Sequence, residues 1–256
     1  MPLPALRRVA LLALAAVAAI GGSATGALVE VEDIVLHADG SFQPQTLPRH
    51  RYAPIDFQGR IDIAAKGGGR PPPLKQALID FDRDGRLSVA GLPVCAPESI
   101  AQATPEEARR ICRGAIVGTG RVEAMVPVEE GSPRMVPGSS PLTVFNGPRV
   151  GGLPSAVLHA RTTVPSTETY AIVVPIEKIR GEFRYRARLD LPPFAGGLGA
   201  LTHIDVEIGR RYRAGGRNRS YVAARCSDNI LRTHGRFSFE DGTVIDGLVE
   251  KFCRSK

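Results

Sequence analysis

The segments FRYRARLD (residues 183–190) and LTHIDVEI (residues 201–208) carry the clearest structural pattern in the chain. In both, apolar and charged side chains alternate, which is the period of a β-strand with one buried face. We expect the two strands to pair antiparallel, with both apolar rows on one face of the sheet. This register predicts cross-strand ion pairs on the other face, namely Arg186 with Glu207, Arg188 with Asp205 and, through the next hairpin, Arg225 with Glu207.

Similar strand patterns recur from residue 28 to the end of the chain. Short segments of alternating or β-branched apolar residues are separated by Gly, Pro, Asn and Asp. The expected strands are 28–36, 58–64, 77–81, 86–89, 115–128, 143–145, 155–160, 169–176, 181–191, 201–213, 220–226, 229–239 and 243–252. This density of short strands predicts an all-β fold, either an antiparallel β-sandwich or an open barrel.

One short helix interrupts the strands. Thr104 can cap it, Pro105 occupies the first helical position and Glu107 completes a T-x-x-E capping box, which predicts a helix over residues 105–112. Residues 66–73 and 129–141 are rich in Gly, Pro or Ser and are predicted to be loops. We expect residues 28–256 to form a single all-β domain, and the alternative is a division into two parts near residues 129–141.

Residues 1–27 have the pattern of a signal peptide. Arg7 and Arg8 precede an unbroken apolar run over residues 9–20, and small residues follow, with cleavage expected after Ala24 or Ala27. The apolar run is shorter than the roughly 20 residues that a membrane span needs. We therefore expect a secreted or envelope-associated protein with no transmembrane span in the mature chain.

The four cysteines are interpreted as two disulfides, because exported proteins meet oxidising conditions. Cys95 and Cys112 bracket the predicted helix, and Cys226 and Cys253 flank a hairpin that turns at residues 240–243. We expect these two sequential pairs. Zinc ligation is the alternative, but the chain has no CxxC motif and no histidine at ligand spacing from a cysteine.

The basic charge does not indicate a nucleic-acid partner. The chain has 33 Lys and Arg against 26 Asp and Glu, and its formal charge of +7 falls to +5 when Arg7 and Arg8 leave with the leader. Such a charge is ordinary for solubility at this size. Most of the cations are arginine and accompany abundant Ala, Gly and Pro, a composition typical of a GC-rich genome.

An acidic motif, D-x-D-x-D-G, spans residues 80–85 and resembles the first half of a calcium loop. Such a loop needs a bidentate glutamate at its twelfth position, where this chain has Gly91. We expect a tight turn between two strands. The alternative is a weak surface cation site with Asp80, Asp82 and Asp84 as ligands.

The G-x-G at residues 118–120 lacks the third glycine and the following helix of a dinucleotide site. It is interpreted as a bulge within a strand. No cofactor is predicted.

An arginine-rich hairpin is the best candidate for a binding surface. It is expected to turn at Gly215 and Gly216, and no carboxylate near it in the sequence offsets its charge. The functional hypothesis is an electrostatic contact with an anionic partner such as an envelope polymer, a lipid head group or a polyanionic glycan. The alternative is a charged strand edge that resists aggregation. The candidate binding residues are Arg210, Arg211, Arg213, Arg217 and Arg219.

No catalytic constellation is recognisable in the sequence. The histidines are scattered, there is no G-x-S-x-G elbow, and the cysteines are expected to be oxidised. His203, Asp205 and Glu207 share one strand face, so an exported hydrolase with sheet-face carboxylates is the alternative to a binding or structural module. His159 lies in an apolar strand and is expected to be a core residue.

Three segments resemble an uncharacterised family of bacterial exported proteins: Phe145-Asn146-Gly147-Pro148, Ser220-Tyr221-Val222-Ala223-Ala224-Arg225-Cys226 and Phe239-Glu240-Asp241-Gly242-Thr243. The resemblance extends over most of the mature chain and implies export and an all-β fold. The family has no assigned activity, so it implies no catalytic residues.

Overall fold

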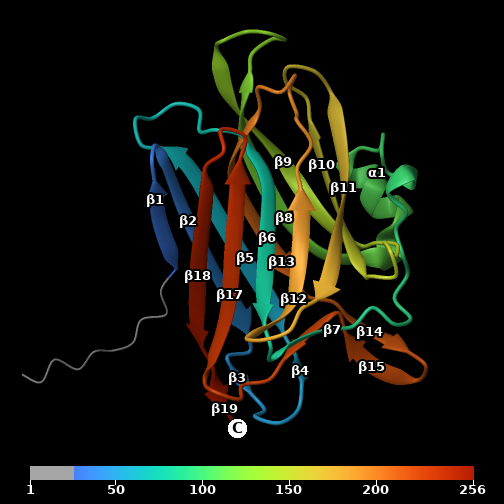
Figure 1. The fold of residues 1–256 in the computed structure, drawn as a ribbon. Coiled ribbons are helices and arrows are strands. Elements are labelled where there is room, and N and C mark those ends of the chain that lie inside the picture. Colours follow the sequence, from blue (N-terminus) through green and yellow to red (C-terminus); the bar gives the residue numbers. More distant parts are fainter. Residues whose placement is uncertain (1–25) are drawn as a thin grey trace, which may run out of the picture.

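The computed structural model describes residues 26–256, which form an all-β fold around a nearly closed antiparallel sheet of twelve strands (Figure 1). The neighbours follow the order β1-β2-β5-β13-β8-β9-β10-β11-β12-β6-β17-β18. These strands are β1 (Ala27–Val31), β2 (Ile34–Gln43), β5 (Asp56–Ala65), β6 (Leu74–Asp82), β8 (Ile116–Pro127), β9 (Met135–Asn146), β10 (Ser155–Thr162), β11 (Glu168–Lys178), β12 (Phe183–Asp190), β13 (Ala200–Ile208), β17 (Ile230–Phe239) and β18 (Val244–Phe252). The predicted all-β class is confirmed, in its open-barrel form.

Side chains join the two edges of the sheet. The edge strands β1 and β18 lie in contact, and a Cβ on Gly247 would meet the Ala27 methyl group at 3.4 Å. Lys251 Nζ on β18 lies 2.6 Å from Asp39 Oδ1 on β2. These contacts hold the sheet in a curved form with an apolar interior.

Short strands gather at one end of the sheet, the lower end in Figure 1. A three-stranded sheet of β4 (Ala53–Pro54), β16 (Val222–Ala224) and β7 (Gly85–Leu87) lies there, beside the hairpin of β14 (Arg211–Ala214) and β15 (Arg217–Ser220). The strands β3 (Thr46–Leu47) and β19 (Arg254–Ser255) pair in parallel nearby.

The predicted pairing of residues 183–190 with 201–208 is wrong. Strand β12 lies between β11 and β6, and β13 lies between β5 and β8. The observed ion pairs are therefore different ones: Arg186 with Asp80, Arg188 with Asp190, and Arg225 with Asp84. The predicted faces are correct, because Ala187 and Leu189 of β12 pack in the same core as Ile204 and Val206 of β13. Alternation specifies which side chains face inward, but it does not specify the neighbouring strand.

The predicted helix and both predicted disulfides are confirmed. Helix α1 (Pro105–Ile111) begins with a capping box, in which Glu107 N donates to Thr104 Oγ1 at 3.3 Å and Thr104 N donates to Glu107 Oε2 at 2.8 Å. The helix contacts β9 and β10. The disulfides are Cys95–Cys112 and Cys226–Cys253.

The loop predicted over residues 129–141 is too long. Strand β9 begins at Met135, and Val128 N donates to Arg134 O, so a short hairpin turn joins β8 to β9. Strands on both sides of this turn belong to the same sheet. The loop at residues 66–73 is confirmed, as is the hairpin turn at residues 240–243, which the structure places between β17 and β18 with Phe237 opposite Ile245.

The predicted leader over residues 1–27 lies almost wholly outside the described residues, which begin at Gly26. Within the described residues, no helix is both long and apolar enough to cross a membrane.

The G-x-G at residues 118–120 lies in β8, next to an irregularity in the β8–β9 register. Its two glycines allow close contact with β13, because a Cβ on Gly120 would lie 2.0 Å from Asp205 O and a Cβ on Gly118 would lie 2.4 Å from Glu207 O. Both atoms belong to the backbone, which cannot rotate away as a side chain can. The glycines therefore have a structural role in strand packing.

Replacement of Gly120 by alanine is expected to lower the free energy of unfolding by about 2–3 kcal/mol, because β8 and β13 must move apart. The matched control is Gly138→Ala on β9, whose new Cβ would lie 3.5 Å from Val126 Cγ2, an ordinary contact. Urea denaturation of both variants measures the difference. Equal stabilities would show that the β8–β13 contact relaxes without penalty.

Candidate functional site

The arginine-rich hairpin forms as predicted. Strands β14 and β15 pair antiparallel, and the turn residues Gly215 and Gly216 have φ values of 57° and 72°. Two successive positive φ values are typical of the tight hairpin turns that favour glycine.

The two faces of this hairpin separate the five predicted arginines. Arg219 lies opposite Tyr212 and Arg217 lies opposite Ala214, so these side chains share one face. By the alternation of a strand, Arg211 and Arg213 lie on the other face. Arg210 precedes the hairpin and donates to Ile116 O at 3.4 Å. The five arginines therefore do not form a single cluster.

A carboxylate offsets one of these charges, contrary to expectation. Arg211 Nη2 lies 3.0 Å from Asp56 Oδ2, on strand β5. Sequence analysis missed this pair because the two residues are far apart in the chain.

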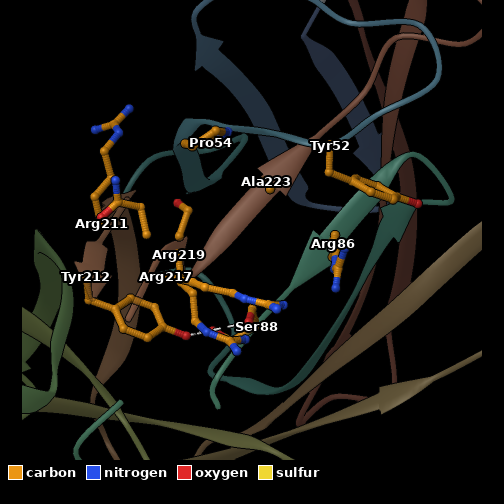
Figure 2. Close-up of a pocket in the computed structure, with 11 residues that line it drawn as sticks. Tyr52, Pro54, Arg86, Ser88, Arg211, Tyr212, Arg217, Arg219 and Ala223 are labelled. Atoms are coloured by element: carbon orange, nitrogen blue, oxygen red, sulfur yellow. Dashed lines mark hydrogen bonds between the residues drawn. The ribbon is translucent and has the colours of Figure 1, made fainter. Parts of the chain in front are cut away.

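Arg217 and Arg219 line a pocket of about 710 Å³ between the hairpin and strand β7, which we call the arginine pocket (Figure 2). Tyr212 holds the hairpin against this region, since its hydroxyl lies 3.1 Å from Ser88 O and 3.2 Å from Ala90 O. Figure 2 shows the side chains of Arg217 and Arg219 extending toward Ser88, while Arg211 extends in a different direction. Arg211 and Tyr212 also contribute to the lining, and its remaining charged or aromatic residues are Tyr52 and Arg86.

Three arginine side chains lie around the ring of Tyr52, which lines the pocket. The guanidinium carbons of Arg86, Arg225 and Arg184 lie 5.4, 5.5 and 5.6 Å from the centre of its ring. Arg184 also donates to the Tyr52 hydroxyl. Each of these contacts is a cation–π arrangement. This cluster could not be predicted from local sequence patterns, because its members come from segments that are far apart in the chain.

Some of these arginines have no compensating anion. Arg225 Nε donates to Asp84 Oδ1 at 2.7 Å, so this charge is neutralised. Within residues 26–256, no carboxylate forms an ion pair with Arg86, Arg217 or Arg219. Moreover, the Nε atom of Arg219 is buried and has no hydrogen-bond partner in this range. A guanidinium can only donate hydrogen bonds, so the missing partner is an acceptor.

The three aspartates of the D-x-D-x-D-G motif are buried and hold neighbouring segments. Asp80 receives a bidentate contact from Arg186, at 2.7 and 2.8 Å. Asp82 accepts from the backbone N–H of Asp84 at 2.8 Å and of Arg232 at 2.9 Å. The predicted turn between two strands is confirmed, joining β6 to β7. Among the described residues, no group of His, Cys, Asp and Glu has the arrangement of a metal site.

The pKa values of neighbouring aspartates in this motif move in opposite directions. Burial raises the pKa of Asp82, and its backbone hydrogen bonds only partly oppose this effect. Burial also acts to raise the pKa of Asp84, but hydrogen bonds from Ser227 and Arg225 outweigh it and lower the pKa. Asp84 is thus held as a carboxylate beside the Tyr52 cluster.

His203 links two strands on the outer face of the sheet. Its Nδ1 lies 2.6 Å from Asp62 Oδ1 on β5, and its Nε2 lies 3.1 Å from Asp205 Oδ2. Burial acts to lower its pKa, but the hydrogen bonds with the two carboxylates outweigh burial and raise it. Because both ring nitrogens are engaged, His203 is not placed as a free general base. Glu207, the third residue of the hydrolase alternative, contacts Gln58 Nε2 at 3.5 Å.

His159 is a core residue, as expected. It is fully buried, and its Nε2 lies 3.2 Å from Ala103 O, while its Nδ1 has no partner in the described part of the chain. Burial lowers its pKa.

Comparison of the chain with models of protein families, with curated proteins and with solved structures finds no match. The resemblance to exported bacterial proteins therefore stays a prediction.

Proposed function

We propose that this chain is an extracytoplasmic binding protein whose arginine pocket holds the anionic head group of a lipid. The observation that carries the proposal is that Arg86, Arg217 and Arg219 line one pocket and have no ion-pair partner in the described residues. Phosphate and carboxylate oxygens are the acceptors that guanidinium groups bind best.

An extracytoplasmic location is consistent with both disulfides, which persist in oxidising compartments. Of the anionic partners that the sequence suggests, the lipid head group fits better than an extended polymer or glycan. The reason is that the arginine pocket has apolar and aromatic walls from Tyr52, Pro54 and Ala223 beside its guanidinium groups. A strongly polar polymer would make little use of these walls.

Binding to vesicles of phosphatidylglycerol tests the proposal. We expect the wild-type protein to bind them and to be released as the salt concentration rises, because mobile ions screen exposed charges. Replacement of both Arg217 and Arg219 by serine should weaken binding at least about tenfold, since each charge-assisted hydrogen bond contributes ~1.5–3 kcal/mol. Co-sedimentation over a range of lipid concentrations measures the effect.

The matched control removes two positive charges elsewhere, with Arg113→Ser and Arg213→Ser. Arg113 lies outside the pocket, and Arg213 lies on the opposite face of the hairpin from Arg217 and Arg219. Both double variants have the same net charge. If the two variants lose binding equally, the protein recognises charge in general and the arginine pocket is not the site.

A further inference from the structure

The interior of the twelve-stranded sheet contains an apolar cavity of about 320 Å³, which we call the sheet cavity. Side chains from strands across the sheet line it, among them Leu158, Ile176, Ala187, Leu189, Ile204 and Val206. These six residues face the interior and yet are only partly buried. A sheet of twelve strands encloses a wider space than side chains of this size fill. A void of this volume is costly to leave empty in a protein core, which favours an occupant.

A second cavity, of about 110 Å³, continues the apolar space toward the loop that follows β12, at the upper end of the sheet in Figure 1. Along β10, Ala156 and Leu158 line the sheet cavity, and Leu158 and Ala160 line the second one. These alternate positions share one face of the strand, so the two cavities lie end to end on the interior face with no strand between them. The wall of the second cavity includes Pro192, an exposed residue of that loop. A ligand that enters at this end therefore has to displace side chains but no strand.

Among the described residues, the walls of the sheet cavity offer no charged partner to a ligand. Three charged residues lie at its edge, namely Asp39, Arg60 and Arg86. Asp39 follows the inward-facing Ala38 and lies opposite Arg60 in the β2–β5 ladder, so both charged side chains point outward. Arg86 lies over the ring of Tyr52, in the arginine pocket. A charge without a partner is strongly unfavourable in an apolar environment, so the sheet cavity selects an uncharged ligand.

The volume of the sheet cavity indicates the size of the ligand. Cavities with apolar walls stay dry, and one of ~150 Å³ binds benzene. The sheet cavity has about twice that volume, so it suits a hydrocarbon of two rings or a molecule of similar bulk. We propose that the sheet cavity binds a single uncharged hydrophobic molecule of this size, at a site separate from the arginine pocket. The two sites lie on opposite faces of the three-stranded sheet of β4, β16 and β7, since Val222 packs in the core and its neighbour Ala223 lines the pocket.

Equilibrium dialysis with naphthalene measures this binding, and we expect one naphthalene per protein molecule. Two competitors of nearly the same shape then test the selection against charge. The uncharged 2-acetylnaphthalene should displace naphthalene at least about a hundredfold more effectively than the anion 2-naphthoate. Displacement reports on the naphthalene site alone, so naphthoate bound in the arginine pocket does not affect it. No binding of naphthalene, or equal displacement by the two competitors, would overturn the inference.

Two phenylalanine substitutions locate the site. Ala187→Phe places a ring in the sheet cavity, and Ala64→Phe adds the same ring at an exposed position of β5. The first should reduce the affinity for naphthalene at least about tenfold, because the new ring takes space that the ligand needs. The control should leave the affinity unchanged, and so should Arg217→Ser with Arg219→Ser. Unchanged affinity in Ala187→Phe, or loss of naphthalene binding in the arginine variant, would overturn the separate site.

Methyl resonances of the wild-type protein give a second test that needs no substitution. On addition of naphthalene, we expect shifts for Leu158, Ile176 and Val206, which line the sheet cavity. Leu28 and Leu248 are exposed and should not shift. Shifts at these two residues as large as those inside the sheet would show adsorption on the outer surface and would contradict the proposal. Naphthalene binding and vesicle binding are measured separately, so either can fail while the other stands.

Discussion

Replacement of Cys226 and Cys253 by alanine is expected to lower the free energy of unfolding by about 3–4 kcal/mol, the loss that the chain-entropy model gives for a loop of this length. The cysteines are 27 residues apart, and the cross-link restricts the unfolded chain between them. Both are buried, and they join the chain just after β16 to the end of β18. Alanine is preferred to serine because a serine hydroxyl would be buried at these positions.

Guanidinium denaturation under non-reducing conditions measures this loss, and the second disulfide provides the comparison. Cys95 and Cys112 are 17 residues apart, so their replacement by alanine should destabilise the protein slightly less. Of the two disulfides, Cys226–Cys253 is the one near the arginine pocket, because Cys226 follows β16, whose residue Ala223 lines the pocket. We therefore expect weaker vesicle binding in the Cys226/Cys253 variant alone. An unfolding free energy equal to that of the wild type would show that packing determines this region without the cross-link.

Much of the fold follows from short-range sequence patterns. The alternation in residues 183–190 predicts which side chains face the core, and Thr104 with Glu107 predicts where α1 begins. Cysteine spacing, together with the export expected from the pattern of residues 1–27, predicts both disulfides. Each of these features depends on residues that are close in the chain, or on chemistry that allows few alternatives.

Strand order could not be predicted in the same way. Residues 191–199 connect β12 to β13, and the sequence pattern is the same whether the two strands pair or lie apart in the sheet. The true partners of Arg186 and Arg225 are Asp80 and Asp84, more than a hundred residues away. To predict such pairs one must know the order of all the strands in the sheet, and local sequence patterns do not specify that order.

The candidate site also has a part that local sequence patterns predict and a part that they do not. The hairpin at residues 211–220 could be predicted from its glycines and its alternating pattern, and so could its charge. The role of Tyr52 and Arg86 could not, because the three-stranded sheet of β4, β16 and β7 assembles from distant segments. The apolar cavity inside the sheet could not be predicted either, since an apolar residue beside a cavity has the same sequence pattern as one in a filled core.

Asp84→Ala is expected to destabilise the protein by about 3 kcal/mol, because Asp84 is buried and its partners cannot be satisfied elsewhere. Its side chain is 1% exposed and accepts from Arg225 Nε and Ser227 N, both at 2.7 Å. The substitution would leave a guanidinium and a backbone N–H without their acceptor. It should also weaken binding at the arginine pocket, since Asp84 positions Arg225 beside Tyr52.

The pH dependence of stability distinguishes this role from simple loss of packing. Because hydrogen bonds lower the pKa of folded Asp84, its stabilising effect is complete above the unfolded value and is lost as the pH falls through the folded pKa. The stability difference between the wild type and Asp84→Asn should therefore shrink below about pH 4.

Asp82 has a raised pKa, so the wild type should gain stability relative to Asp82→Asn as the pH falls through that pKa. Urea denaturation across the acid range measures both, and parallel curves for the two variants would contradict the assignment. Opposite trends for the two variants would show that the two aspartates have different roles. The carboxylate of Asp84 positions Arg225, whereas Asp82 closes the turn although burial disfavours its charged form.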